Sequence, residues 1–157
     1  MTKGMGQVES SIYLENDYEG LDCVWIASDQ DENVGAFVTF GSGPIFSKAV
    51  RNDWLDFEAI ESAVLDLCVT SEYVDSDYVS AWPMGCSPYS EILERGFFVY
   101  DWLGGDVYQL MGIPINPISV TALPRPLRML ALSASLQLSF STTPVVDPST
   151  MFIPCSK

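Results

Sequence analysis

The chain contains one strong β pattern near its N-terminal end, formed by two apolar runs at 21–28 and 34–40. Both runs are rich in β-branched and aromatic residues, and the residues between them are acidic or carry amides. Two such runs joined by a short polar segment predict a β-hairpin. The expected cross-strand pairs are Ser28–Val34, Ile26–Ala36, Trp25–Phe37 and Val24–Val38. Because these pairs place apolar side chains on both faces, we expect cover on both sides and a position in the middle of a sheet.

A helical pattern follows over 53–68, with Asp53 as its expected N-cap. The apolar stripe of this helix consists of Phe57, Ile60, Val64, Leu67 and Cys68. Polar residues recur at four-residue steps on the opposite face, and Leu55 falls on that outer face as well. These polar residues are Glu58, Ser62 and Asp66. We therefore expect a helix that packs inward and presents negative charge outward.

Weaker patterns predict the remaining elements. They are a short edge strand at 12–17, a helix at 87–95 ended by Gly96, a hairpin of 97–103 and 106–111 with Trp102 opposite Val107, a strand at 118–122, a helix at 126–134 and a strand at 136–140. Hairpins and helices without long crossovers indicate an α+β fold. We expect a single domain over 1–157, with a mainly antiparallel sheet of five or six strands, a helix packed on one face, and irregular ends at 1–11 and 142–157.

The predicted core joins the first hairpin, the helix over 53–68 and the second hairpin. Its members are Val24, Trp25, Ile26, Val38, Phe57, Ile60, Val64, Leu67, Phe98, Tyr100 and Leu138.

The charge of the chain is strongly asymmetric. The net charge is −14, and residues 1–106 hold 20 of the 21 acidic side chains but 4 of the 7 basic ones. Between Arg51 and Arg95 there are ten acidic residues and no basic residue. Such a field repels nucleic acid and anionic lipid and speeds the encounter with a basic partner. Solubility alone is the alternative explanation of the same acidity.

Several classes of active site are absent from the sequence. The chain contains no histidine, which removes Ser-His-Asp and Cys-His mechanisms and the commonest metal ligand. Its cysteines contain no C-x-x-C pair, so we expect Cys23 and Cys68 to be buried thiols. Acidic clusters at 29–33 and 75–77 remain as candidates for cation binding or acid–base chemistry. We expect no enzymatic activity, no cofactor and no metal, and the alternative is an enzyme or ligand-binding domain with a carboxylate-lined pocket.

The sequence also bears on localisation. Residues 1–11 lack the apolar core of a secretory signal, and no run approaches the ~18 apolar residues of a membrane span. We therefore expect a soluble, cytoplasmic protein.

The segment 18–46 carries a resemblance to a known group of proteins. The residues that carry it are Tyr18, Gly20, Leu21, Asp22, Val24, Trp25, Gly35, Ala36, Phe37, Thr39, Gly41, Gly43, Pro44 and Ile45. This pattern resembles small acidic bacterial proteins that are similar to the immunity proteins of polymorphic toxin and contact-dependent growth inhibition systems. The resemblance implies a cytoplasmic protein that neutralises a cognate toxin C-terminal domain. It includes no catalytic residue and does not indicate which toxin is bound.

Charge and resemblance together predict a partner-binding surface on the helix over 53–68 and the acidic residues after it. Its predicted members are Leu55, Asp56, Glu58, Glu61, Asp66, Glu72, Asp75, Asp77 and Trp82. The acidic side chains are expected to attract a basic toxin domain, whereas Leu55 and Trp82 are expected to supply apolar anchors.

Overall fold

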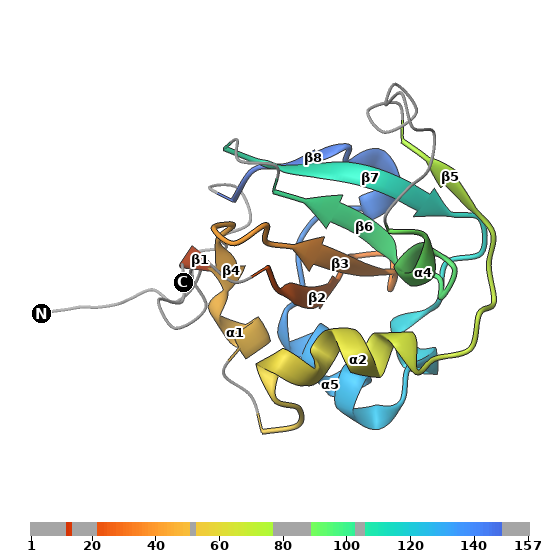
Figure 1. Ribbon diagram of the computed structural model, residues 1–157, viewed down its shortest axis with the longest axis horizontal. Coiled ribbons are helices and arrows are strands. Elements are labelled where there is room, and N and C mark those ends of the chain that lie inside the picture. The colour runs from red at the N-terminus through yellow and green to blue at the C-terminus, as the bar shows by residue number, and fades with distance from the viewer. Residues whose placement is uncertain (1–11, 14–21, 51–52, 77–88, 103–105, 149–157) are drawn as a thin grey trace, which may run out of the picture.

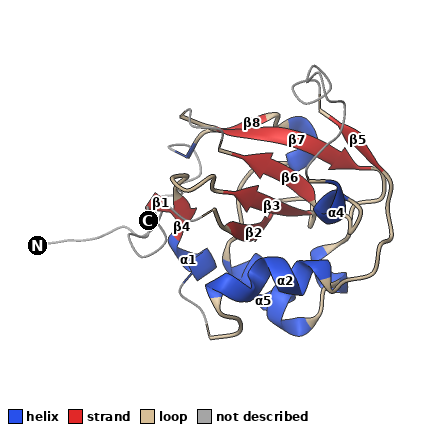
Figure 2. Cartoon of the chain, in the orientation of Figure 1, coloured by secondary structure: helices blue, strands red, loops and turns tan. Residues whose placement is uncertain are grey.

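The computed structural model of the chain describes residues 12–13, 22–50, 53–76, 89–102 and 106–148. Within these ranges the chain forms a six-stranded mixed sheet with helices packed around it (Figures 1 and 2). The strands in sheet order are β2 (Val24–Ser28), β3 (Val34–Val38), β6 (Phe98–Asp101), β7 (Tyr108–Pro114) and β5 (Tyr73–Asp75), and β8 (Val145–Val146) also pairs with β7. β3 and β6 are parallel, whereas the other pairs are antiparallel. The predicted α+β fold with a mainly antiparallel sheet is therefore confirmed.

The first hairpin forms in the predicted register but not in the predicted place. β2 and β3 pair with Trp25 opposite Phe37 and Ser28 opposite Val34, and every residue of both strands is buried. However, β2 lies at an edge of the sheet and not in its middle. Segments beyond the sheet supply the cover: α2 (Ile60–Leu65) and α5 (Arg125–Ser133) pack against β2, and the N–H of Ser28 donates to the carbonyl of Ala134 at 3.2 Å. In Figure 2 these helices gather beneath the β2 edge.

A second, two-stranded sheet lies beside the first hairpin. It pairs β1 (Ile12–Tyr13) with β4 (Ile45–Phe46), and β4 leads directly into α1 (Ser47–Val50). The edge strand expected at 12–17 begins here, and residues 14–17 lie outside the described residues.

The helix predicted over 53–68 is shorter than expected. It consists of η3 (Phe57–Ala59) followed by α2, and Asp53 does not cap it because Asp56 is still extended at φ −61° and ψ 139°. At this end of the helix, the guanidinium of Arg95 donates to the carbonyl of Leu65 at 3.0 Å and to that of Leu67 at 3.2 Å, and so satisfies carbonyls that have no partner within the helix. Cys68 is exposed and not buried, since it lies beyond this end of the helix.

The second hairpin pairs β6 with β7 in a register one residue away from the expected one. Tyr100 lies opposite Leu110 and Asp101 lies opposite Gln109, whereas the predicted register placed Trp102 opposite Val107. A β-bulge between the pairs Val99–Gly112 and Tyr100–Leu110 leaves Met111 as the extra residue on β7. α4 (Ser90–Leu93) precedes this hairpin, and Gly96 after it has φ +94°, as expected for a residue that ends a helix.

The last part of the chain agrees with the predictions only for α5. The strand expected at 118–122 is the short helix η4 (Val120–Ala122), and the strand expected at 136–140 is absent, with η5 (Phe140–Thr142) at its end. Beyond residue 141, where we expected no further sheet, β8 pairs with β7.

Aromatic side chains from four segments form the centre of the core. The rings of Trp25 and Phe37 stack with centroids 4.4 Å apart, and Phe37 stacks on Tyr100 at 5.0 Å. Phe140 closes this face, and a Cβ on Gly35 would lie 2.9 Å from its ring. Of the predicted core, Leu67 and Leu138 are only half-buried, and all other members are buried.

Candidate partner-binding surface

Four of the predicted surface acids lie together around α2. Asp56 precedes η3, Glu58 lies on η3, Glu61 lies on α2, and Asp66 directly follows α2. All four side chains are exposed. Leu55 is half-buried and packs against the core, so it does not stand on the outer face where an anchor was expected.

The other predicted acids lie at the opposite edge of the sheet. Glu72 precedes β5 and is exposed, whereas Asp75 lies on β5, is half-buried and has one buried carboxylate oxygen without a hydrogen-bond partner. Three strands separate β5 from β2, which amounts to roughly 19 Å at the usual strand spacing. Asp77 and Trp82 lie outside the described residues. The described acids thus form two groups and not one continuous patch.

A cleft of about 280 Å³ opens between the start of β2 and the segment from η3 to α2. We call it the acidic cleft, and its lining consists of Asp22, Cys23, Val24, Phe57, Glu58 and Glu61. Val24 and Phe57 are buried and give it apolar walls, whereas its three carboxylates give it negative charge, and no lysine or arginine is among the described residues of the lining. An apolar wall beside carboxylates suits a side chain with an aliphatic stem and a cationic head.

The field of the acidic cleft acts on the thiol of Cys23. Burial raises the pKa of this thiol, and the charges of Asp22, Glu58 and Glu61 raise it further. Because the thiolate is the reactive form, a raised pKa makes Cys23 a poor nucleophile. The same carboxylates that disfavour a thiolate favour a bound cation.

Phe40 lies next to the acidic cleft on a left-handed turn. The sequence pattern placed it at the end of a strand, but β3 ends at Val38, and Phe40 has φ 52° with Gly41 at φ 85°. The N–H of Phe40 donates to the carboxylate of Asp22 at 3.0 Å. Phe40 is 58% exposed, which is more than most apolar residues in the described ranges. A bulky residue with positive φ costs about 1–3 kcal/mol, so the surrounding turn must hold it there.

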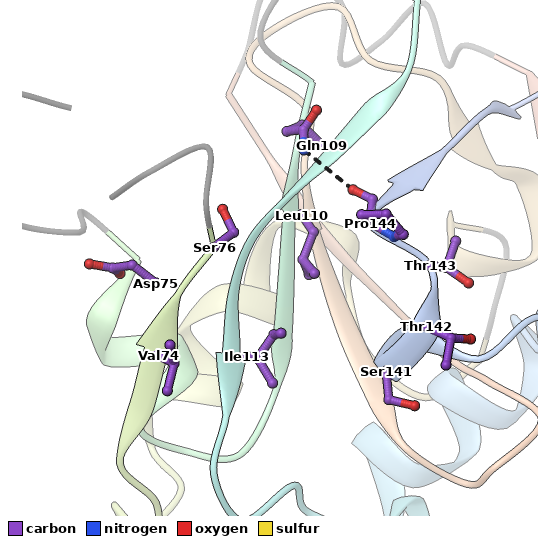
Figure 3. A pocket seen from close by; sticks show the side chains of 10 residues that line it. All are labelled: Val74, Asp75, Ser76, Gln109, Leu110, Ile113, Ser141, Thr142, Thr143 and Pro144. Atoms are coloured by element: carbon purple, nitrogen blue, oxygen red, sulfur yellow. Dashed lines mark hydrogen bonds between the residues drawn. The ribbon is translucent and has the colours of Figure 1, made fainter. Parts of the chain in front are cut away.

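A second hollow, of about 450 Å³, lies at the other edge of the sheet (Figure 3). β5 forms one wall and residues 141–144 form the other, with Leu110 and Ile113 of β7 between them. The bulge at Met111 allows Leu110 and Ile113 to line the same side of the strand. The lining is mostly apolar or uncharged, and the carboxylate of Asp75 points away from Leu110 and Ile113 (Figure 3).

The acidic cluster at 29–33 has a structural role. Asp29 is 5% exposed, and its carboxylate accepts hydrogen bonds from the N–H groups of Asp31, Asn33 and Phe140, at 2.9, 2.9 and 2.7 Å. These bonds close the hairpin turn and attach η5 to it. Across the described ranges, no group of three or more histidine, cysteine or carboxylate side chains is arranged to hold a metal ion.

Asp101 is a second buried carboxylate. It is 2% exposed; one oxygen accepts a hydrogen bond from the hydroxyl of Tyr89, and the other has no partner. Burial raises the pKa of Asp101, and the charge of Asp22 adds to this effect although the Tyr89 bond opposes it. The sequence around Asp101 does not distinguish it from an exposed strand residue, because its burial depends on the segments that pack over β6.

Comparison with protein-family models, curated proteins and solved structures finds no match to this chain. In the part of the chain that the structure describes, no helix has the length and apolar character needed to cross a membrane. The site is therefore interpreted from its own geometry, and the acidic cleft with Phe40 is the arrangement in which charge, shape and an exposed aromatic side chain coincide.

Proposed function

We propose that this protein is a cytoplasmic immunity protein that binds and neutralises a basic bacterial toxin domain. The observation that carries the proposal is the acidic cleft, which includes Glu58 and Glu61 of the η3–α2 segment; the exposed carboxylates of Asp56 and Asp66 lie at the two ends of the same segment. The resemblance of residues 18–46 to immunity proteins supports the same function. An inhibitor of this kind needs a complementary surface and does not need catalytic groups.

The proposed surface contributes to binding in two ways. Exposed carboxylates around α2 attract a basic domain during diffusion, and such steering raises association rates most at low salt. Apolar and aromatic contacts at the centre of an interface determine how long a complex lasts. In this proposal the acids around α2 provide the first contribution, and the walls of the acidic cleft together with Phe40 provide the second.

The alternative function, chemistry in a carboxylate-lined pocket, receives less support from the described residues. The hollow in Figure 3 has mostly uncharged lining, and the buried carboxylate of Asp29 is occupied by three backbone N–H groups. The thiol in the acidic cleft has a raised pKa, which disfavours nucleophilic catalysis there.

The full chain is first co-expressed with C-terminal domains of secreted proteins that are encoded by neighbouring genes. The domains that co-purify with the chain are then used as its toxin partners. For a captured domain, the association rate is measured by stopped flow across a range of salt for the parent and for the Glu58→Lys, Asp66→Lys variant. The matched control is Glu72→Lys, Glu91→Lys, which changes the net charge equally at exposed residues away from the acidic cleft. We expect the first variant to associate about tenfold more slowly at low salt, with a flatter salt dependence, and the control to change much less.

Equal rates and equal salt dependence for the two variants would place the interface elsewhere. Failure of all co-expressed domains to be retained on the chain would contradict the proposed function itself.

A further inference from the structure

We propose that the outer edge of β5 accepts a β-strand from a partner protein, with a basic residue of that strand opposite Asp75 and an apolar residue opposite Val74. This surface is separate from the one in the proposed function, because β5 and the acidic cleft lie at opposite edges of the sheet. It can therefore be tested without a toxin domain, and either proposal can fail while the other stands.

Two hydrogen bonds at the ends of β5 show how this strand pairs with β7. The N–H of Ile115 donates to the carbonyl of Glu72 at 2.7 Å. The N–H of Ser76 donates to the carbonyl of Met111 at 3.0 Å. Residues 72 and 76 of the β5 segment therefore direct these backbone groups toward β7.

The residues between these two bonds leave an open edge. Val74 lies opposite Ile113, and its backbone faces β7 like that of residues 72 and 76, because hydrogen-bonded pairs alternate in an antiparallel ladder. Tyr73 and Asp75 consequently direct their N–H and carbonyl groups away from β7. β5 is the last strand of the sheet among the described residues, so these groups can pair with a further strand.

The side chain of Val74 favours an apolar residue on one face of the added strand. Val74 lies beside Ile113 (Figure 3) and is 53% exposed. Ile115, two residues after Ile113 and on the same face, is 54% exposed. A residue directly opposite Val74 would contact it across the strands, so an apolar side chain there would remove exposed apolar surface from water.

The side chain of Asp75 favours a basic residue on the other face. Its carboxylate points away from β7 (Figure 3), and one of its oxygens is buried without a hydrogen-bond partner. Glu72 beside it in the segment is exposed, and residues 72–76 contain no lysine or arginine. A lysine or arginine opposite Asp75 would bring an opposite charge and supply the missing donor.

The same charges argue against a second copy of this chain as the occupant of the edge. A second copy would bring its own Glu72 and Asp75 and a net charge of −14 to the interface, and like charges across paired strands are destabilising. Short edge strands with charged side chains protect proteins from self-association. This protection does not act against a basic strand, so the edge selects its partner by the sign of the charge.

The experiment uses the peptide Ac-TVKVTK-NH₂, titrated into the full ¹⁵N-labelled chain and followed by NMR. In antiparallel pairing its first lysine lies opposite Asp75, the valine after it opposite Val74, and its last lysine opposite Glu72. We expect saturable shifts of the amide signals of Tyr73 and Asp75, and slower hydrogen exchange of both amides in the complex. The acidic peptide Ac-TVEVTE-NH₂ should bind at least about fourfold more weakly, because two attractive pairs become repulsive.

Two methylated peptides separate strand pairing from attraction between charges. In the expected pairing the N–H of the first lysine faces β5, whereas the N–H of the valine after it faces solvent. N-methylation of that lysine should abolish the shifts, whereas N-methylation of that valine should preserve most of the binding. Equal binding of the two methylated peptides, or of the basic and acidic peptides, would overturn the inference.

A variant and the free chain provide the remaining tests. Asp75→Asn should weaken binding of Ac-TVKVTK-NH₂ about two- to fivefold, the effect of one ion pair, and unchanged binding would refute the role of the carboxylate. Asp106→Asn, which removes the same charge from an exposed residue before β7, should change nothing. In the free chain the amides of Tyr73 and Asp75 should exchange faster than that of Val74. Equal protection of all three, by the chain itself or by a second copy detected in sedimentation, would also overturn the inference.

Discussion

Removal of the hydroxyl of Tyr108 is expected to weaken the link between the first hairpin, the loop that follows it and the second hairpin. The indole Nε1–H of Trp25 donates to this hydroxyl at 3.1 Å, and the hydroxyl donates to the carbonyl of Pro44 at 2.8 Å. Burial raises the pKa of Tyr108, so the hydroxyl keeps its proton and remains a donor at any ordinary pH. The loop approaches so closely that a Cβ on Gly43 would lie 2.6 Å from the Tyr108 oxygen.

Tyr108→Phe removes one oxygen and leaves two groups without their partner. Trp25 is fully buried, so its N–H cannot find water, and an unsatisfied buried donor costs about 1–3 kcal/mol. Pro44 is half-buried, and its carbonyl should add up to about 1 kcal/mol because water reaches it only in part. We therefore expect a loss of about 1–4 kcal/mol in the free energy of unfolding, or roughly 2–16 °C in melting temperature for a chain of this length.

The assay is urea denaturation followed by tryptophan fluorescence, together with a thermal melt by circular dichroism. Tyr73→Phe is the control, because it removes the same atom from a half-buried residue on the edge strand β5 and should change stability by less than about 0.5 kcal/mol. A loss below about 0.5 kcal/mol for Tyr108→Phe would show that the linked hydrogen bonds do not hold the loop to the sheet.

Three further changes test the packing and the buried charge. Ile60→Ala should lower the free energy of unfolding by about 2–5 kcal/mol in denaturation experiments, because Ile60 is fully buried. Leu67→Ala should lower it by less because Leu67 is only half-buried, and equal losses for the two variants would contradict the observed helix face. Gly35→Ala should lower the melting temperature clearly, since its Cβ would lie 2.9 Å from the ring of Phe140, and an unchanged value would show that the ring can move aside. Asp101 binds its proton more tightly in the folded state, so its contribution to stability falls as pH rises from its ordinary pKa through the raised one. Asp101→Asn should therefore stabilise the protein more at pH 7 than at pH 4 in denaturation experiments, and an equal effect at both pH values would refute this assignment.

Local patterns were sufficient for the elements whose partners are close in sequence. The register of β2 and β3 follows from alternation and turn length, and the pairing of Trp25 with Phe37 was predicted correctly. The buried stripe of α2 and the extent of α5 were also accessible, because helical periodicity is a property of a few neighbouring residues. The prediction of the helix end failed at a place where a distant residue takes part, since Arg95 donates to the carbonyls of Leu65 and Leu67.

The position of the hairpin in the sheet was decided by tertiary structure. Two apolar faces require cover, but the cover can come from strands or from helices, and the sequence pattern is the same in both cases. Here α2 and α5 cover β2, which leaves it at an edge. In the same way the acids after α2 follow the chain to β5 at the far edge, so a continuous charge run in the sequence becomes two separated groups in space.

The candidate site likewise depends partly on the local sequence and partly on the tertiary structure. The sequence by itself determined the sign of the surface, the absence of histidine chemistry and the exposure of Glu58, Glu61 and Asp66. Only the tertiary structure brought Asp22, which precedes β2, to Glu58 and Glu61, and left Phe40 exposed with its N–H bonded to the carboxylate of Asp22. These contacts join residues far apart in the chain, and their geometry depends on how helix and hairpin pack, which no local periodicity encodes.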